Sequence, residues 1–281
     1  MIPTVIERGI ISRQPLQSSM RSLLADRRAA LVIAHPGHEL RVYCWLSLVR
    51  PRVFVLTDGS GQSHKSRLHR TTSILNSRGA RPGSIYGRLS DAEIYLAILN
   101  GEVDLFINLA RELAEALVRD RVEYVVGDAI EGYNPAHDLC RLVTNAAVKL
   151  SCRMGICVEN FDVLLAHKPA NYPPARMAGA MRIDADDQML SQKLQAARDY
   201  SELSVDVNRI VEREGIDELR TEYLRPVSED SHNGVSWNHP YYEVYGEERV
   251  AAGYYAQVIR YREHVLPLAN ALRQYAERSD D

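Results

Sequence analysis

The sequence lacks a long hydrophobic run. No apolar stretch in its 281 residues approaches the roughly 18 residues that a membrane-spanning helix requires. Residues 1–8 also lack the apolar segment that defines a secretory signal peptide. We therefore expect a cytoplasmic protein without a membrane span.

An excess of one charge is also lacking. Lys and Arg number 34 and Asp and Glu number 37, which leaves a formal net charge of −3. Proteins that bind nucleic acid neutralise its phosphates with Lys and Arg, and this composition offers no such surplus. We expect a small-molecule substrate and no nucleic-acid partner.

Cysteine and phenylalanine are scarce. The four cysteines form no CxxC pair and lie in apolar surroundings, so we expect reduced thiols in the core rather than disulfides or metal ligands. They are Cys44, Cys140, Cys152 and Cys157. The 3 phenylalanines contrast with 15 tyrosines, many of them in the last third of the chain. Rings with a polar group suit a partly wet cleft wall or the subunit interface of a homo-oligomer.

Three apolar segments, each ending in a polar loop, predict buried strands. They are residues 29–34, 53–56 and 122–126. Amphipathic helical patterns follow the first and third segments. Strands joined through helices run parallel, so their carboxyl ends meet at one edge of a sheet. In an open α/β sheet that edge forms the ligand crevice.

Three histidines lie on the loops that leave these strands. His35 and His38 directly follow the first strand, and His137 precedes a helix after the third. Three neutral imidazoles can bind Zn²⁺ and leave a fourth position open. An HxxH pair also arises often by chance, and single histidines more commonly serve as hydrogen-bonded packing residues. The spacing alone leaves both interpretations open.

Two short blocks resemble motifs of one enzyme family. Ala34-His35-Pro36-Gly37-His38-Glu39 is similar to the AHPDDE motif of the PIG-L/LmbE family of zinc-dependent N-acetylsugar deacetylases, and Tyr133-Asn134-Pro135-Ala136-His137 resembles its HPDH block. The resemblance spans about residues 29 to 202. Further elements in the family's order are Thr57-Asp58-Gly59-Ser60-Gly61, Arg67, the helix ending at Gly79, and Lys193, Ala196 and Tyr200.

The resemblance implies an α/β fold, a Rossmann-like three-layer sandwich with a mostly parallel sheet. It implies zinc, or another divalent transition metal, at the carboxyl edge. His35 and His137 match two family ligands, and His38 stands where the family has a metal-binding aspartate. Three histidines would leave the metal more positive and a better Lewis acid than two histidines and a carboxylate.

The resemblance fails where the family transfers protons. Gly37 stands in place of the aspartate that acts as general base, and glycine transfers no proton. Asn134 and Ala136 replace the histidine and aspartate of HPDH. We therefore expect a carboxylate outside the usual place to act in catalysis, either Asp58 or Glu131.

Four other residues near these loops receive different roles. Asp138 lies in the first turn of a helix, where capping directs it elsewhere. We expect Glu39 to brace the first loop. Arg67 matches a family arginine that contacts substrate, and Arg70 lies one turn further on, so either could bind a phosphate or carboxylate. A solvated helix face explains both arginines equally well.

Three functions of different classes fit this pattern. The first is a metal-dependent hydrolase, an N-deacetylase or amidase acting on an N-acylated amino sugar or related amide. The second is a metal enzyme turned to another reaction. The third is a non-catalytic protein that binds the metal for structure or as a scaffold.

The length permits one large core with extensions. We expect an N-terminal arm at residues 1–25, a Rossmann-like metal-binding domain at 26–175, and a C-terminal helical extension at 176–281 packed on the same body. A proline-rich loop at 169–174 marks the second boundary. Within the extension, residues 184–201 and 250–276 show helical spacing.

Overall fold

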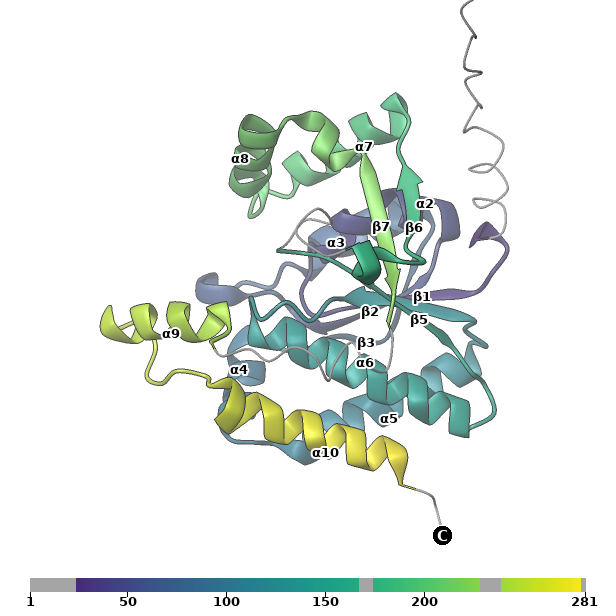
Figure 1. Cartoon of the computed structure of the whole chain (residues 1–281). Helices are drawn as coiled ribbons and strands as arrows, with labels where there is room; N and C mark the ends of the chain where they lie inside the picture. Colours follow the sequence, from purple (N-terminus) through teal and green to yellow (C-terminus); the bar gives the residue numbers. More distant parts are fainter. Residues whose placement is uncertain (1–23, 167–173, 228–238, 279–281) are drawn as a thin grey trace, which may run out of the picture.

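The computed structural model describes residues 24–166, 174–227 and 239–278. A seven-stranded sheet with strand order β3-β2-β1-β4-β5-β7-β6 forms its centre (Figure 1). The strands are β1 (Ala29–Ile33), β2 (Arg52–Thr57), β3 (Arg81–Leu89), β4 (Tyr124–Asp128), β5 (Glu159–Val163), β6 (Met181–Asp184) and β7 (Thr221–Pro226). Strands β1 to β5 run parallel, whereas β7 pairs antiparallel with β5 and β6. The predicted α/β fold with a mostly parallel sheet is confirmed.

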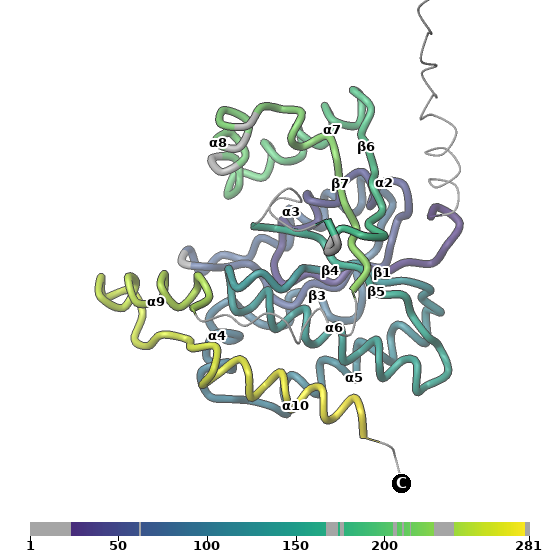
Figure 2. The backbone as a smooth tube through the Cα atoms, in the orientation of Figure 1, coloured from purple at the N-terminus to yellow at the C-terminus, as the bar shows by residue number. Residues whose placement is uncertain are grey.

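Helices cover both faces of the sheet and make the fold three-layered. On one face lie α2 (Tyr43–Val49), α3 (Leu68–Arg78) and α7 (Asp187–Asp199); on the other lie α5 (Val103–Arg119), α6 (Pro135–Arg153) and α10 (Leu266–Glu277). Figure 2 shows α10 on the opposite side of the sheet from α7. The other α-helices in the described ranges are α4 (Asp91–Leu99), α8 (Ser204–Glu214) and α9 (Tyr241–Ala251). None of the helices in the described ranges is both long and apolar enough to cross a membrane.

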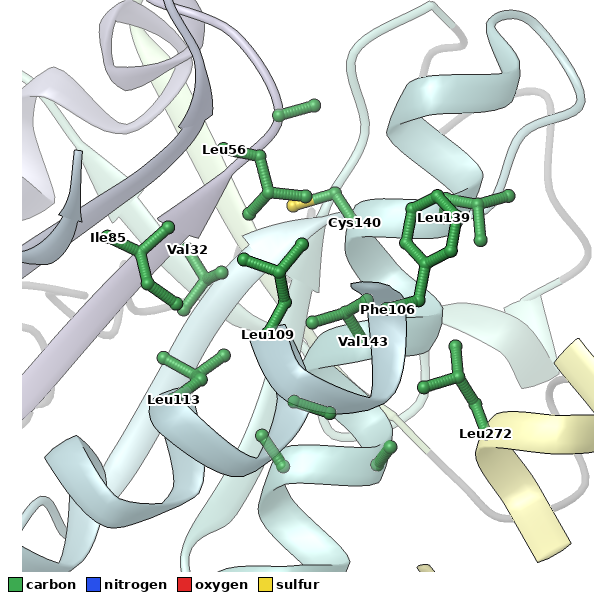
Figure 3. Close-up of a cluster of buried hydrophobic side chains, with 14 of the residues drawn as sticks. Val32, Leu56, Ile85, Phe106, Leu109, Leu113, Leu139, Cys140, Val143 and Leu272 are labelled. Carbon is green, nitrogen blue, oxygen red and sulfur yellow. The ribbon is translucent and has the colours of Figure 1, made fainter. Parts of the chain in front are cut away.

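The central strands are apolar throughout because both their faces are covered. Ala30 and Val32 of β1 pack in one core, and Leu31 and Ile33 pack in the other. A strand buried on both faces therefore reads as a continuous apolar run, without the alternation of apolar and polar residues that a half-exposed strand shows. In the first core, side chains of α5, α6 and α10 interlock beneath the sheet (Figure 3). These two cores hold the carboxyl ends of the strands in place.

The sheet reverses its winding between β1 and β4. The chain passes from β1 to its neighbour β2 on one side, while β4 pairs with the other side of β1. At such a switch point the loops that leave adjacent strands turn apart and open a crevice at the carboxyl edge. The loops after β1 and β4 are the two that carry the histidines.

The C-terminal third differs from the sequence prediction. Residues 250–276 do not form one helix, because α9 ends at Ala251 and α10 begins at Leu266. Gly253 has a φ of 75°, a left-handed conformation that favours glycine and ends the helical run. The helix expected at 184–201 begins at Asp187, since the Asp186 side chain accepts a hydrogen bond from the backbone N–H of Met189 at 2.8 Å and so caps it.

The proposed division into three segments stays a prediction. Only residues 24 and 25 of the expected N-terminal arm are described. Both β6 and β7 come from beyond the expected boundary at residue 175, and both belong to the central sheet.

The prediction of four reduced cysteines is wrong for two of them. Cys152 and Cys157 form a disulfide, with their Cα atoms 4.0 Å apart. Both lie at the exposed end of α6, where Gly155 with its φ of 94° turns the chain back towards β5. The turn brings together two cysteines that are five residues apart and do not form the CxxC spacing that the sequence argument looked for. Cys44 and Cys140 are buried reduced thiols outside any disulfide, as predicted.

Candidate metal centre

His35 leaves the end of β1 as a buried side chain held by two partners. Its Nδ1 lies 2.7 Å from Thr57 Oγ1 and 3.0 Å from Asp91 Oδ1. Its Nε2 is buried and has no hydrogen-bond partner among the described residues. Burial lowers the pKa of His35, against the opposing effect of Asp91. The neutral ring can therefore use Nδ1–H as a donor to the carboxylate and keep the Nε2 lone pair free.

Asp91 belongs to the same arrangement. It is the first residue of α4, and its second oxygen accepts a hydrogen bond from the Gly61 N–H at 2.8 Å. Burial alone would raise the pKa of Asp91, but the hydrogen bond and charge of His35 hold it well below the usual range. An ionised Asp91 fixes the orientation of the His35 ring.

His38 begins the 3-10 helix η1 (His38–Val42) and is held by Asp128 at the end of β4. The Oδ2 atom of Asp128 lies 2.9 Å from His38 Nδ1 and accepts a second hydrogen bond from the Ala34 N–H at 2.7 Å. The other carboxylate oxygen of Asp128, Oδ1, is buried and has no hydrogen-bond partner in the part of the chain that the structure describes. Asp128 therefore connects the loop after β1 to the strand that leads to His137.

His137 is positioned by the N-terminus of α6. Asn134 caps this helix by accepting a hydrogen bond from the Ala136 N–H at 2.9 Å, and Pro135 occupies its first turn. The His137 side chain is buried. Burial, with the charges of His38 and His35, lowers the pKa of His137 well below its ordinary value. Its ring is therefore neutral at pH 7, the form that binds metals.

The three imidazoles predicted from sequence come together. Their ring centroids are separated by 5.4 Å for His35–His38, 5.0 Å for His35–His137 and 4.5 Å for His38–His137. Zn–N bonds of about 2.0–2.1 Å in tetrahedral geometry place the centroids of three imidazoles about 5 Å apart. The expectation that all three histidines meet at the carboxyl edge of the sheet is confirmed.

The three side chains nevertheless do not form an assembled metal site. Within the described ranges, no group of three or more His, Cys, Asp or Glu side chains is arranged to hold a metal ion. The centroid distances therefore show that the three rings are close together, and binding of a metal would require the side chains to adjust.

Gly37 occupies a conformation that other residues rarely adopt. Its φ is 108° and its ψ is −21°. A Cβ atom there would lie 2.6 Å from Leu203 Cδ1, so Leu203 fills the space that a side chain at this position would need. The loop is braced by the buried Glu39 carboxylate, which accepts hydrogen bonds from the Gly37 N–H at 2.7 Å and from Thr71 Oγ1 at 2.8 Å. The bracing role predicted for Glu39 is confirmed.

The two carboxylates predicted to act as base are bound to backbone groups. Asp58 Oδ1 accepts from the Ser60 N–H at 2.9 Å within its own turn. Glu131 Oε2 accepts from the N–H groups of Leu165 and Ala166 at 2.7 and 2.9 Å. Both lie on loops at the carboxyl edge of the sheet, and their catalytic role stays a prediction.

Asp138 is fully enclosed beside the same loop. Its Oδ1 accepts hydrogen bonds from the N–H groups of Glu131 and Gly132, at 3.1 and 3.3 Å. Burial raises the pKa of Asp138 to about 7, against the effect of these two hydrogen bonds. The side chain is thus occupied in closing its own loop, as its position at the helix start suggested.

The two arginines predicted to bind substrate make contacts within the protein. Arg67 Nε donates to the Gly59 carbonyl and so holds the turn after β2. Arg70 donates to Ser201 Oγ at 3.0 Å and lies 3.7 Å from a carboxylate oxygen of Glu202. Arg70 therefore fastens the segment after α7 to α3, and contact of either arginine with substrate stays a prediction.

Sequence reasoning missed the residues that orient the histidines. Thr57, Asp91 and Asp128 each contact an imidazole, and none belongs to the two histidine blocks. A usable signal was present for Asp128, an acidic residue at the end of a buried apolar strand beside the first histidine loop. Asp91 is the first residue of α4, where an acidic residue is common, so nothing in the sequence pointed to its contact with His35.

Comparisons with known proteins find similarity to solved structures only. No protein-family model and no curated protein matches this chain. One similar structure is a triple mutant of a deacetylase of the teicoplanin biosynthetic pathway, with 18% identity and a TM-score of 0.45 over 72% of this chain and 99% of that one. The zinc-inhibited form of teicoplanin deacetylase Orf2 has 16% identity and a TM-score of 0.46, with the same coverage. The conserved protein TT1542 from Thermus thermophilus has 16% identity and a TM-score of 0.46, covering 72% of this chain and 95% of its own.

Proposed function

We propose that this chain is a metal-dependent hydrolase that removes an acyl group from an N-acylated amino sugar or a related amide. The observation that carries the proposal is the meeting of His35, His38 and His137 at the carboxyl edge, with the spacing of three imidazoles around one metal. In their chemistry the three imidazoles, one with a buried and unpaired Nε2, fit a divalent metal such as zinc, although the described side chains are not arranged around one in this structure. Three neutral nitrogen ligands suit this ion and leave a position open for a reactant.

The buried partners of the histidines support this proposal. Asp91 and Asp128 bind the Nδ1 atoms of His35 and His38, which leaves both Nε2 atoms as the ligand atoms. Carboxylates bound to histidines in this way fix the tautomer and the direction of the ring in metal sites. The buried and unpaired His35 Nε2 is otherwise a costly arrangement.

When bound, the metal supplies a Lewis acid that polarises the amide carbonyl and activates water. The chain must supply the group that takes a proton and returns one to the leaving amine. We propose Asp58 or Glu131 for this role. Each already accepts backbone hydrogen bonds, which hold a carboxylate in place as they would hold its amide.

A metal-binding protein without hydrolytic activity is the second candidate. It is favoured by Gly37, which leaves no base at the position where related enzymes carry one, and by Leu203, which fills the adjacent space. The two candidates share the metal centre and differ in turnover.

Metal analysis of purified protein tests the shared centre. We expect about one zinc per chain, lost in His35→Ala, His38→Ala and His137→Ala. The matched control is His69→Ala, an exposed histidine outside the trio. Full metal content in any of the three variants would remove that histidine from the centre.

A hydrolysis assay separates the candidates. We expect zinc-dependent release of acetate from N-acetylglucosamine derivatives, at a rate reduced by about 10² to 10⁴ in either Asp58→Asn or Glu131→Gln. Each amide variant keeps an oxygen that can accept the backbone hydrogen bonds, so a lower rate reports on proton transfer. Zinc binding without turnover would favour the second candidate, and full turnover in both variants would exclude these two carboxylates as the base.

A further inference from the structure

A row of exposed tyrosines extends from the metal centre along α9. Tyr133, Tyr241 and Tyr245 keep 48%, 52% and 38% of their surface exposed. The ring centroids of Tyr133 and Tyr241 lie 5.1 Å apart with planes 3° from parallel, and those of Tyr241 and Tyr245 lie 6.0 Å apart. Large exposed side chains that gather in this way mark a binding surface more often than isolated ones do.

The helix is anchored so that this row faces outward. Tyr242 is buried, and its backbone N–H donates to the Gly132 carbonyl at 3.3 Å. The buried Glu243 carboxylate accepts from the Tyr261 N–H at 2.7 Å. Tyr241 and Tyr245 are four residues apart and therefore share one face of the helix. In Figure 1, α9 stands at the side of the molecule, joined to α10 by an irregular segment.

The row is continuous with the candidate metal centre. The ring centroid of Tyr133 lies 6.5 Å from that of His137. At the other end, the Arg249 guanidinium lies 5.7 Å from the ring centroid of Tyr245 and 3.9 Å from that of Tyr254. The surface therefore begins at a proposed metal ligand and ends at a cation packed on aromatic rings.

The tyrosine side chains of the row suit a sugar better than a membrane surface. A tyrosine ring offers an apolar face with a hydroxyl at its edge, which matches a sugar ring with an apolar C–H face and polar hydroxyls. A membrane surface fits poorly, because α9 carries three acidic residues and a single basic one, Arg249, whereas helices that lie on membranes are rich in Lys and Arg.

We propose that Tyr133, Tyr241 and Tyr245 bind a further sugar ring of the substrate, so that the acylated amine belongs to an oligosaccharide rather than to a single sugar. This inference rests on the proposed function and specifies the length of its substrate. One sugar lies at the histidines, and the next lies on the tyrosines.

Calorimetric titration of the purified protein tests the proposal. The probes are N-acetylglucosamine and its β-1,4-linked disaccharide and trisaccharide, each recovered and checked for deacetylation by mass spectrometry. We expect the longer sugars to bind about tenfold more tightly than the single sugar, which is the scale of one aromatic contact. Tyr241→Ala should remove this advantage, whereas Tyr241→Phe keeps the ring and should retain it. Val244→Ala, an exposed residue of the same helix outside the row, is the matched control.

The outcomes distinguish the two proposals. Equal binding of single and longer sugars by the unaltered protein would overturn the inference, as would an advantage that survives Tyr241→Ala. A change in sedimentation for Tyr241→Ala without a change in sugar binding would assign the row to a subunit interface instead. A preference that depends on Tyr241, with every sugar recovered intact, would support the binding surface while the proposed hydrolysis fails.

Discussion

Replacing Gly37 with alanine tests whether backbone strain and the contact with Leu203 exclude a side chain at this position of the loop after β1. The backbone at a φ of 108° is strained for any residue with a Cβ, at a cost of roughly 1–3 kcal/mol. The new Cβ would also lie 2.6 Å from Leu203 Cδ1. Forcing an extra methyl group into a packed site costs roughly 1–3 kcal/mol more. We expect Gly37→Ala to lower the free energy of unfolding by about 2–6 kcal/mol.

Denaturant unfolding of a double-mutant cycle separates the two causes. Leu203→Ala removes the clash but leaves the backbone strain, so the double variant should recover about 1–3 kcal/mol relative to the sum of the single variants. A loss below about 0.5 kcal/mol in Gly37→Ala, or the absence of coupling to Leu203, would refute the reasoning. Gly37→Asp should be destabilised in the same way, and an increase in its hydrolysis rate would show that the position can still accept a base.

Three further predictions concern buried polar groups. Asp128→Asn should weaken zinc affinity about 10- to 100-fold, measured by calorimetry, because it removes the carboxylate that holds the His38 ring. Circular dichroism should show unchanged secondary structure. Unchanged zinc affinity would contradict this role of Asp128. Lys193→Met should lower the free energy of unfolding by about 3–5 kcal/mol, because it leaves buried Glu222, which lies 2.8 Å from Lys193 Nζ, without its cation; a loss near zero in urea unfolding would contradict this. In metal-free protein the pKa of Asp138 is about 7 in the folded state and near 3.8 in the unfolded state. Between these two values the folded state keeps a proton that the unfolded state releases. The free energy of unfolding should therefore fall as the pH rises from about 4 to about 7. The fall should reach up to about 4 kcal/mol and disappear in Asp138→Asn, and an equal pH dependence in both proteins would exclude Asp138 as its source.

The central fold could be predicted because local and tertiary signals agree there. The strand at residues 29–34 is apolar and β-branched, and the structure buries it on both faces. The helix α4 begins at Asp91 because Ser90 and Glu93 form a reciprocal cap, a local signal that the sequence itself carries. In these segments the local sequence pattern alone indicates the secondary structure, and contacts with the rest of the chain do not change it.

The C-terminal third could not be predicted for the opposite reason. β6 and β7 are short strands with mixed polar and apolar residues, and only pairing with each other and with β5 defines them. The histidines were found because they follow strands whose ends must meet. Their carboxylate partners were not, since Asp91 and Asp128 reach the histidines from distant parts of the sequence and only through folding.

The placement of β7 has a consequence for how the chain is made. Hydrogen-bonding groups along the outer side of β5 pair with β7, which comes about 60 residues later in the chain. At a synthesis rate of roughly 5–20 residues per second, β5 leaves the ribosome several seconds before its partner exists. An unpaired strand edge is a template for pairing with other chains. Nascent chains that stall after β5 should therefore depend on chaperones more heavily than those released with β7 complete.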